Sequence, residues 1–394
     1  MKTPKCKSLK LTLIAGFIFF SNLFFAQKPE KVYSVVKVNK DCEWYIEQAK
    51  LWKKEIAKDS TDAEAWFNFY KANKYAQFPN VCKKDTEFLR NNSAIMPIDI
   101  IINEIKKTIP QSYLSGFLDY NPWDTSTYYQ LYKAHKRQPL ETEIYPMLAA
   151  NYEITQQREK RKEINNTWFN ANDISPALLA YNYNMLVSCE KDAILITMGD
   201  NDTFPAWLLQ DMKNVRTGIT VLNISLMTIP WYRKELFEKL NIPQMENDWK
   251  NSNHQNQGLI IKHILENIQD NKPLYIAATV SKSFYKDFTK NMYLTGLAFK
   301  YSKEKMDNIA YIRKNYEKNY LLDYLHINLT NDMGEDIVNK WNISYLPGFV
   351  KLYRHYIITG EKQKAVELKA LCLQIAEKVS SGWYEYIKKA TEED

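Results

Sequence analysis

Short apolar runs alternate with helical segments between about residues 175 and 302, and this alternation limits the fold more than any other feature. The first run, Ala193 to Met198, is almost wholly apolar, as in a strand buried on both faces of a parallel sheet. Similar runs follow at Ile219 to Leu226 and Pro273 to Val280, with Tyr293 to Phe299 as a candidate fourth strand. Helical patterns occupy Pro176 to Val187, Phe204 to Met212, Trp231 to Leu240 and Gly258 to Gln269. The pattern predicts an α/β fold with a small, mostly parallel sheet and crossover helices.

Helical hairpins are predicted on both sides of this region. Residues 43–78 contain two amphipathic helices separated by Asp59-Ser60-Thr61-Asp62, and their small and aromatic residues resemble a tetratricopeptide unit. Weaker units of the same kind cover 143–163 and 346–378, too far apart for a continuous solenoid. We therefore divide the chain into a leader (1–26), a helical, tetratricopeptide-like region (27–165), an α/β region (166–302) and a second helical, tetratricopeptide-like region (303–394).

The first 26 residues have the composition of a secretory signal peptide. Four lysines and no acidic residue accompany the apolar run Leu11 to Phe25, and Ala26 supplies a small residue for cleavage. A membrane anchor is the alternative, but a spanning helix needs about 20 apolar residues and this run is shorter. No later run reaches that length. We predict cleavage after Ala26 and a periplasmic or secreted mature chain without a membrane span.

Net charge bears on the choice of partner. The chain carries +7, and loss of the four leader lysines leaves 7 − 4 = 3. A charge of this size indicates neither nucleic acid nor an anionic membrane surface as a partner.

The cysteines fit an oxidising compartment, where disulfides persist. Cys42 opens one helix of the first hairpin and Cys82 follows the other. Because antiparallel helices bring these two ends together, we predict a Cys42–Cys82 disulfide. Cys189 and Cys372 lie in apolar contexts and are expected to be buried thiols.

An acidic stretch follows the first predicted strand, at the edge where open α/β sheets bind ligands: Gly199-Asp200-Asn201-Asp202-Thr203-Phe204-Pro205. Asp200 and Asp202 could share a divalent cation, since hard cations take carboxylate oxygens. Thr203 and the amides entering the next helix could instead hold an anion. The structural alternative is that Asp202 or Thr203 caps that helix while Gly199 relieves a tight turn. The stretch is not an EF-hand loop, because Phe204 stands at a ligand position.

Four further side chains are expected to line the same crevice. Arg216 precedes the second strand, Asn223 lies near its end, and Trp231 and Tyr232 begin the next helix. The alternative is that these are strand-end and core groups satisfied by the backbone. No Gly-rich phosphate loop, nucleophile elbow or His-Glu-x-x-His motif occurs in the chain, so no catalytic residue is assigned and the divalent cation is the one cofactor considered.

One part of the chain matches the pattern of a known family. It runs from Tyr181 through Ala193-Ile-Leu-Ile-Thr-Met-Gly-Asp-Asn-Asp-Thr-Phe-Pro205 to Trp231-Tyr232, and Tyr293-Leu294 later in the chain matches as well. It resembles the soluble, C-terminal periplasmic region of a bacterial family of multi-spanning membrane proteins of unknown function. That family is related to protein O-mannosyltransferases and counted among lipid-sugar-dependent glycosyltransferases. The resemblance covers roughly 175–375. It implies the periplasmic module of that family and not its membrane-embedded transferase part, which this chain replaces with a signal peptide and a helical hairpin.

These observations favour a non-catalytic periplasmic module that binds a glycan, a polypeptide or a membrane glycosyltransferase partner. A metal-dependent enzyme is the second hypothesis; it would act on a glycan or sugar-phosphate through Asp200 and Asp202. The third is a structural scaffold whose helical hairpins bind a protein. Metal binding that depends on both aspartates would favour the second, whereas a captured membrane protein would favour the first or third.

Overall fold

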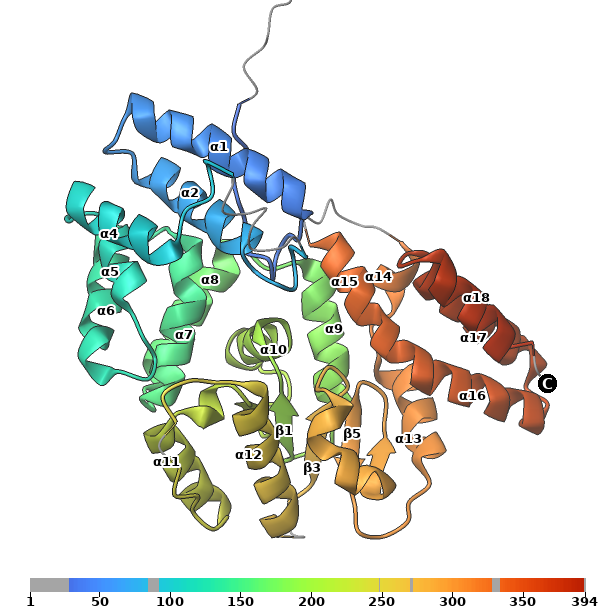
Figure 1. Cartoon of the computed structure of the whole chain (residues 1–394). Helices are drawn as coiled ribbons and strands as arrows, with labels where there is room; N and C mark the ends of the chain where they lie inside the picture. Colours follow the sequence, from blue (N-terminus) through green and yellow to red (C-terminus); the bar gives the residue numbers. More distant parts are fainter. Residues whose placement is uncertain (1–27, 84–91, 248, 270–271, 328–333, 393–394) are drawn as a thin grey trace, which may run out of the picture.

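The computed structural model describes residues 28–83, 92–247, 249–269, 272–327 and 334–392. The predicted signal peptide, 1–26, lies outside the described residues. The described chain is mostly helical around one small sheet, with α1 and α2 at one end of the molecule and α16 to α18 along one side (Figure 1).

The sheet has five strands in the order β2-β1-β3-β5-β4. β1 (Ile194–Thr197) lies between β2 (Thr220–Asn223) and β3 (Leu274–Ala277) and is parallel to both, as the three apolar runs predict. β5 (Ala298–Tyr301) is antiparallel to β3 and to β4 (Met292–Leu294). The prediction of a mostly parallel sheet is therefore wrong, and the sheet is mixed.

A glycine explains the difference. The predicted fourth strand, Tyr293 to Phe299, is split at Gly296, whose φ of +144° is a backbone conformation that L side chains rarely adopt. A Cβ atom there would lie 1.8 Å from the Tyr320 hydroxyl. The chain therefore turns back within three residues, and a hairpin this short makes β4 and β5 antiparallel.

Helices connect the parallel strands where the sequence places them. α9 (Pro176–Val187) begins with Ser175 as its cap and Pro176 in its first turn, and it matches the predicted range. α10 (Asp200–Lys213) joins β1 to β2, and α11 (Pro230–Leu240) and α12 (His254–Asn267) lie between β2 and β3. α10 starts four residues before its predicted start at Phe204, so the acidic stretch forms its first turn.

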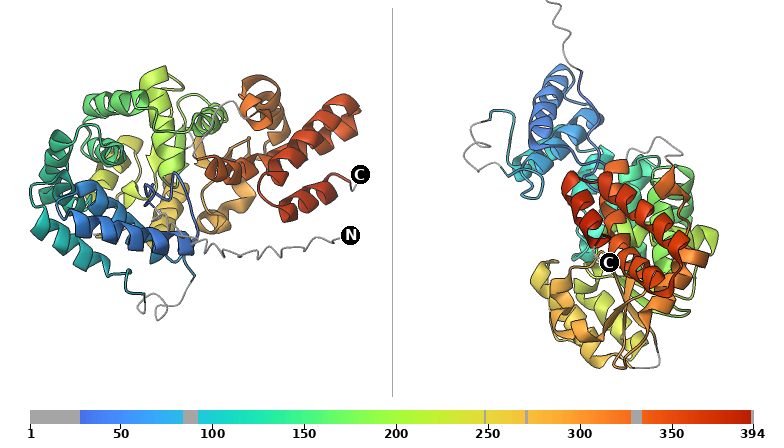
Figure 2. Two further views of the ribbon diagram at one scale, coloured as in Figure 1. Left: turned by 90° about the horizontal axis from the view of Figure 1, so that it is seen from above. Right: turned by 90° about the vertical axis from the view of Figure 1, so that its right-hand side faces the viewer.

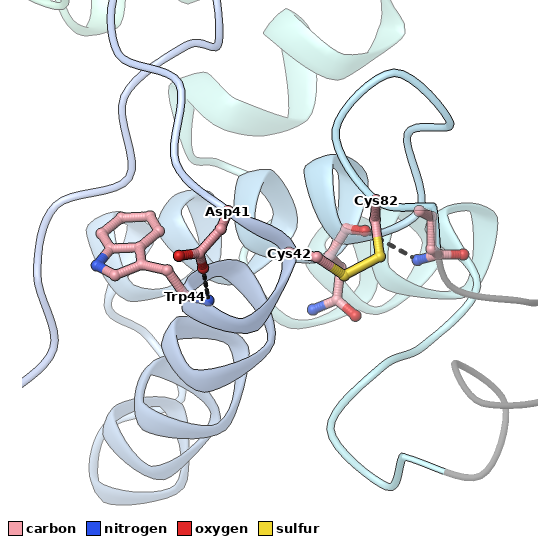
Figure 3. Close-up of a disulfide and its surroundings, with 6 residues drawn as sticks. Asp41, Cys42, Trp44 and Cys82 are labelled. Atoms are coloured by element: carbon pink, nitrogen blue, oxygen red, sulfur yellow. Dashed lines mark hydrogen bonds between the residues drawn. A yellow bond between two sulfur atoms is a disulfide. The ribbon is translucent and has the colours of Figure 1, made fainter. Parts of the chain in front are cut away.

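The first helical hairpin consists of α1 (Cys42–Lys58) and α2 (Ala63–Ala76). Asp41 caps α1 by accepting a hydrogen bond from the Trp44 amide at 2.7 Å. Cys42 and Cys82 form a disulfide with their Cα atoms 4.8 Å apart, which ties the start of α1 to the segment after α2 (Figure 3). The hairpin projects from one end of the body in the side view of Figure 2.

The remaining helices form the flanks. On the N-terminal side these are α4 (Ile98–Thr108), α5 (Tyr113–Asp119), α6 (Tyr128–Arg137), α7 (Tyr145–Ile154) and α8 (Arg158–Asn170). The C-terminal side has α13 (Asn308–Lys314), α14 (Asp323–His326), α15 (Glu335–Asn342), α16 (Leu346–Thr359), α17 (Lys362–Glu377) and α18 (Ser381–Ala390). The α7–α8 and α16–α17 pairs are the hairpins expected at 143–163 and 346–378.

Apolar side chains gather in two clusters. One lies between Val32 and Leu114 around the first hairpin, and the larger runs from Tyr128 to Ile387 through the sheet and the C-terminal helices. Among the described residues, every helix is too short or too polar to cross a membrane.

Candidate functional site

Asp202 caps α10. Its carboxylate is fully buried and accepts hydrogen bonds from the Met198 amide at 2.9 Å and the Gly199 amide at 2.8 Å. The hydroxyl of Thr279, which follows β3, donates a further bond. Burial raises the pKa of Asp202, although these three donors oppose the shift. Asp202 therefore joins the ends of β1 and β3, at the edge where such sheets commonly hold a ligand.

A proline fixes the first turn of α10 to α9. Pro205 lies inside the helix and has no amide hydrogen to donate to the Asn201 carbonyl one turn earlier. The Asn182 side chain donates to that carbonyl instead, at 2.8 Å, and also to Leu178 at 2.9 Å. The backbone defect at Pro205 is therefore repaired by a neighbouring helix, which fixes the orientation of the acidic turn.

Thr203 and Asn223 are brought together, as the predicted crevice requires, but they contact each other. The Asn223 amide donates to Thr203 Oγ1 at 3.0 Å, and Thr203 Oγ1 lies 2.7 Å from the Thr197 hydroxyl. The side-chain oxygen of Asn223, Oδ1, accepts from the Ser225 and Leu226 backbone amides at 2.8 and 3.0 Å. These buried groups join β1, α10 and β2 and face one another.

Asp200 is arranged differently. Within the described residues its carboxylate has no hydrogen-bond or ion-pair partner, and solvent reaches it through a cavity of about 290 Å³. The protein surrounding that cavity displaces bulk water, and this burial raises the pKa of Asp200 to about 6. The charge of Asp202 adds to the rise and that of Lys74 opposes it. Asp200 is thus the member of the acidic turn that is available to a ligand.

A stretch near the N-terminus, residues 28–40, covers this cavity, and we call it the strap. Asn201 donates its side-chain amide to the Val36 carbonyl at 2.9 Å. Lys37 forms an ion pair with Asp173, which also accepts from Trp168 Nε1 at 2.9 Å and Thr142 Oγ1 at 3.1 Å. The strap cavity is therefore bounded by the strap, the turn before α9 and the first turn of α10.

Aromatic and aliphatic side chains supply most of the remaining wall. Trp168 and Phe204 pack with their ring centroids 5.7 Å apart, and Ile337 and Val338 of α15 also line the cavity. Phe204 belongs to the acidic stretch marked by the sequence, but Trp168, Ile337 and Val338 did not stand out, because they come from segments far apart in the chain. A further local signal existed for the turn before α9, where Ser175-Pro176 is a typical helix start.

The other predicted ligand residues lie elsewhere. Arg216 occupies the turn before β2 with φ of +51° and donates to the carbonyls of Val187 and Cys189 at 3.4 and 2.9 Å. Trp231 is the second residue of α11 and is not among the cavity residues. Tyr232 is buried and donates to Glu153 at 3.0 Å. The structure therefore separates these three residues from Asp200.

Tyr232 belongs to a buried ion-pair network at the other end of α10. Arg161 of α8 donates two bonds to Asp211, at 3.1 and 3.0 Å, and contacts Glu153. Burial disfavours the Arg161 charge, yet Glu153 and Asp211 hold its pKa above the usual value. Asn165 adds a bond to Asp211 at 2.8 Å. We call these five residues, Glu153, Arg161, Asn165, Asp211 and Tyr232, the α10 network.

Fold and site define a class: a helical protein built around a small α/β unit, with a cavity beside the first strand–helix turn. Residues 179–242 match the family model described as TMEM260-associated domain 2. The matched segment holds β1, α10 and β2, with most of α9 and all of α11, and so includes Asp200 and Asp202 but neither the strap nor α15. The match is consistent with an accessory domain of a TMEM260-like family. No curated protein and no solved structure matches the chain.

Proposed function

We propose that this chain is an exported accessory module of a TMEM260-like system and that it binds its ligand in the strap cavity through Asp200. The observation that carries the proposal is the open carboxylate. Asp200 is exposed to solvent in the cavity and has no partner among the described residues, whereas Asn201, Asp202 and Thr203 are paired within the protein. The signal-peptide pattern and the match at 179–242 support an exported accessory role.

A covalent trap tests this directly. A photo-cross-linking aliphatic residue replacing Ile337, in the cavity wall, should give a specific adduct in the exported fraction, and its mass distinguishes a glycan from a polypeptide. The same replacement at Ile358, which is 84% exposed on α16, is the matched control. Asp200→Asn should reduce the adduct from position 337. Equal adducts from both positions, or none from 337, contradict the proposal.

A metal-dependent enzyme acting through Asp200 and Asp202 is the rival. Asp202 could share an ion only by giving up hydrogen bonds from Met198, Gly199 or Thr279. Thermal unfolding with Mg²⁺, Ca²⁺ or Mn²⁺ separates the two proposals. A rise in the midpoint that disappears in Asp200→Asn supports the enzyme, and an unchanged midpoint supports the binding module.

A further inference from the structure

The charged side chains around the strap cavity leave one negative charge uncompensated. Lys37, Asp173 and Asp200 are the charged lining residues, and the Lys37–Asp173 ion pair cancels two of them. Asp200 remains. A cationic group is therefore the ligand part that this cavity would favour most, because attraction between opposite charges strengthens where protein replaces water.

The polar side chains of the wall are mostly engaged as well. Ser175 accepts from the Leu178 amide at 3.1 Å, Asn201 donates to Val36, and Asp173 is held by three donors. Among the described lining residues, Asp200 and Asn172 are the polar side chains without a partner. A sugar ring presents several hydroxyl groups, each of which needs a partner when it leaves water. Two free side chains do not meet that need.

Size and shape point the same way. The volume of about 290 Å³ lies just below the range of about 300–1,000 Å³ typical of small-molecule pockets, which suits one long side chain better than an oligosaccharide. Trp168 and Phe204 are 3% and 8% exposed, so neither offers the open ring face on which a sugar stacks. They offer apolar wall for an aliphatic arm.

We infer that the strap cavity binds a protonated amine on an apolar arm, such as a lysine side chain of a polypeptide, with Asp200 as its counter-ion. The inference rests on the proposed function and specifies its ligand as an amine of a polypeptide and not a glycan. The charge of Lys74 in α2 acts on Asp200, but the two form no ion pair among the described residues. The Lys74 ammonium group lies over the rings of Tyr70 and Tyr75, 5.8 and 6.0 Å from their centroids.

Small probes test the class of ligand. The full exported chain is titrated with Nα-acetyl-lysine methylamide, its uncharged norleucine counterpart and methyl α-mannoside, and the indole N–H resonance of Trp168 reports occupancy of the wall. We expect the lysine probe to bind about tenfold more tightly than norleucine and the mannoside to leave Trp168 unchanged.

Variants locate the interaction. Asp200→Asn should abolish the preference for lysine over norleucine, while Asp287→Asn, at an exposed aspartate of the segment Lys282–Asn291, should preserve it. Lys74→Gln removes the like charge and should tighten lysine binding about twofold. Mannoside binding without lysine binding would overturn the inference yet leave the proposed function standing. Lysine binding that Asp200→Asn does not weaken would also overturn it, whereas failure of all probes together with no adduct at Ile337 would remove both.

Discussion

The two ends of α10 treat an acidic side chain in opposite ways. At its C-terminal end Asp211 belongs to the α10 network, where Arg161 and Asn165 donate hydrogen bonds to its buried carboxylate. At its N-terminal end Asp200 faces a cavity with no partner among the described residues, although Asp202 two residues later is fully paired. α10 thus carries a compensated charge, that of Asp211, at its C-terminal end and an uncompensated charge, that of Asp200, at its N-terminal end.

The difference separates stability from function. A buried charge that is paired holds elements together, and breaking the pair leaves the other charge exposed to a low dielectric. An unpaired charge destabilises the fold until something binds it. Substitution of a paired charge should therefore destabilise the protein, whereas substitution of the unpaired charge of Asp200 should stabilise it.

Arg161→Met should destabilise the protein by about 3–5 kcal/mol, because it leaves Asp211 and Glu153 without their cation. Chemical denaturation measures the change. Arg158→Met, at an exposed arginine of the same helix α8, is the control and should lie within about 0.5 kcal/mol of wild type. An equal loss in both variants would mean that the α10 network does not hold this end together.

Asp202→Ala should cost about 2–3 kcal/mol, since two buried amides and the Thr279 hydroxyl lose their acceptor. Asp62→Ala removes a less buried cap from α2 and should cost about 1 kcal/mol. Urea unfolding of both variants compares a buried cap with an accessible one. If the two losses were alike, burial would not be the reason why Asp202 is engaged.

Tyr232→Phe should cost about 1.5 kcal/mol, because it deletes one bond to a charged group but leaves the Arg161–Glu153 pair in place. The measurement is again the free energy of unfolding, with Tyr129→Phe, at a tyrosine that is 67% exposed, as the neutral control. A loss as large as that of Arg161→Met would show that the hydroxyl, and not the ion pairs, organises the network.

Asp200→Asn should stabilise the protein by about 1 kcal/mol at pH 7.5 and have little effect at pH 3.5. The pKa of Asp200 is raised to about 6, so the folded state holds its proton more tightly than the unfolded state. Its contribution is favourable at low pH and is lost as pH rises from the unfolded value towards 6. Fully buried, such a shift would correspond to about 3 kcal/mol, and solvent access reduces this to about 1.

Thermal unfolding between pH 3.5 and 7.5 checks the sign of this effect, with Asp287→Asn as the matched control. A destabilised Asp200→Asn protein at pH 7.5 would mean that Asp200 has a structural partner, as Asp211 has at the other end of α10.

The sequence predicts the parallel half of the sheet well, because a continuous apolar run is a local property of β1, β2 and β3. It does not predict the antiparallel half, since Tyr293 to Phe299 has strand composition on both sides of Gly296. Only the crowding against Tyr320, which lies 24 residues further along, makes that glycine a turn. Helix starts marked by a cap, such as Ser175, were predictable too, because a cap is also a local property of the sequence.

The candidate site was half predictable. The stretch from Gly199 to Pro205 marked the right turn, and both the cap and the ligand interpretations apply there, one to Asp202 and one to Asp200. The sequence could not show which aspartate is the cap and which is open to a ligand. Residues two apart on a helix point in different directions, and only the packing of α9 and β3 reveals those directions. Arg216 and Tyr232 were assigned to the site only from their order in the chain. In the structure Arg216 donates to Val187 and Cys189, and Tyr232 donates to Glu153.

The strap cavity has walls from the beginning and the end of the chain: Val36 on one side and Val338 on the other. Contacts of such long sequence separation form late in folding, because the entropy of closing so large a loop must be overcome first. If the chain is exported as proposed, it has no cavity until nearly all of it has crossed the membrane. Occupancy of Asp200 would then report that translocation and folding are complete, and a ligand that binds there would select finished molecules over nascent ones.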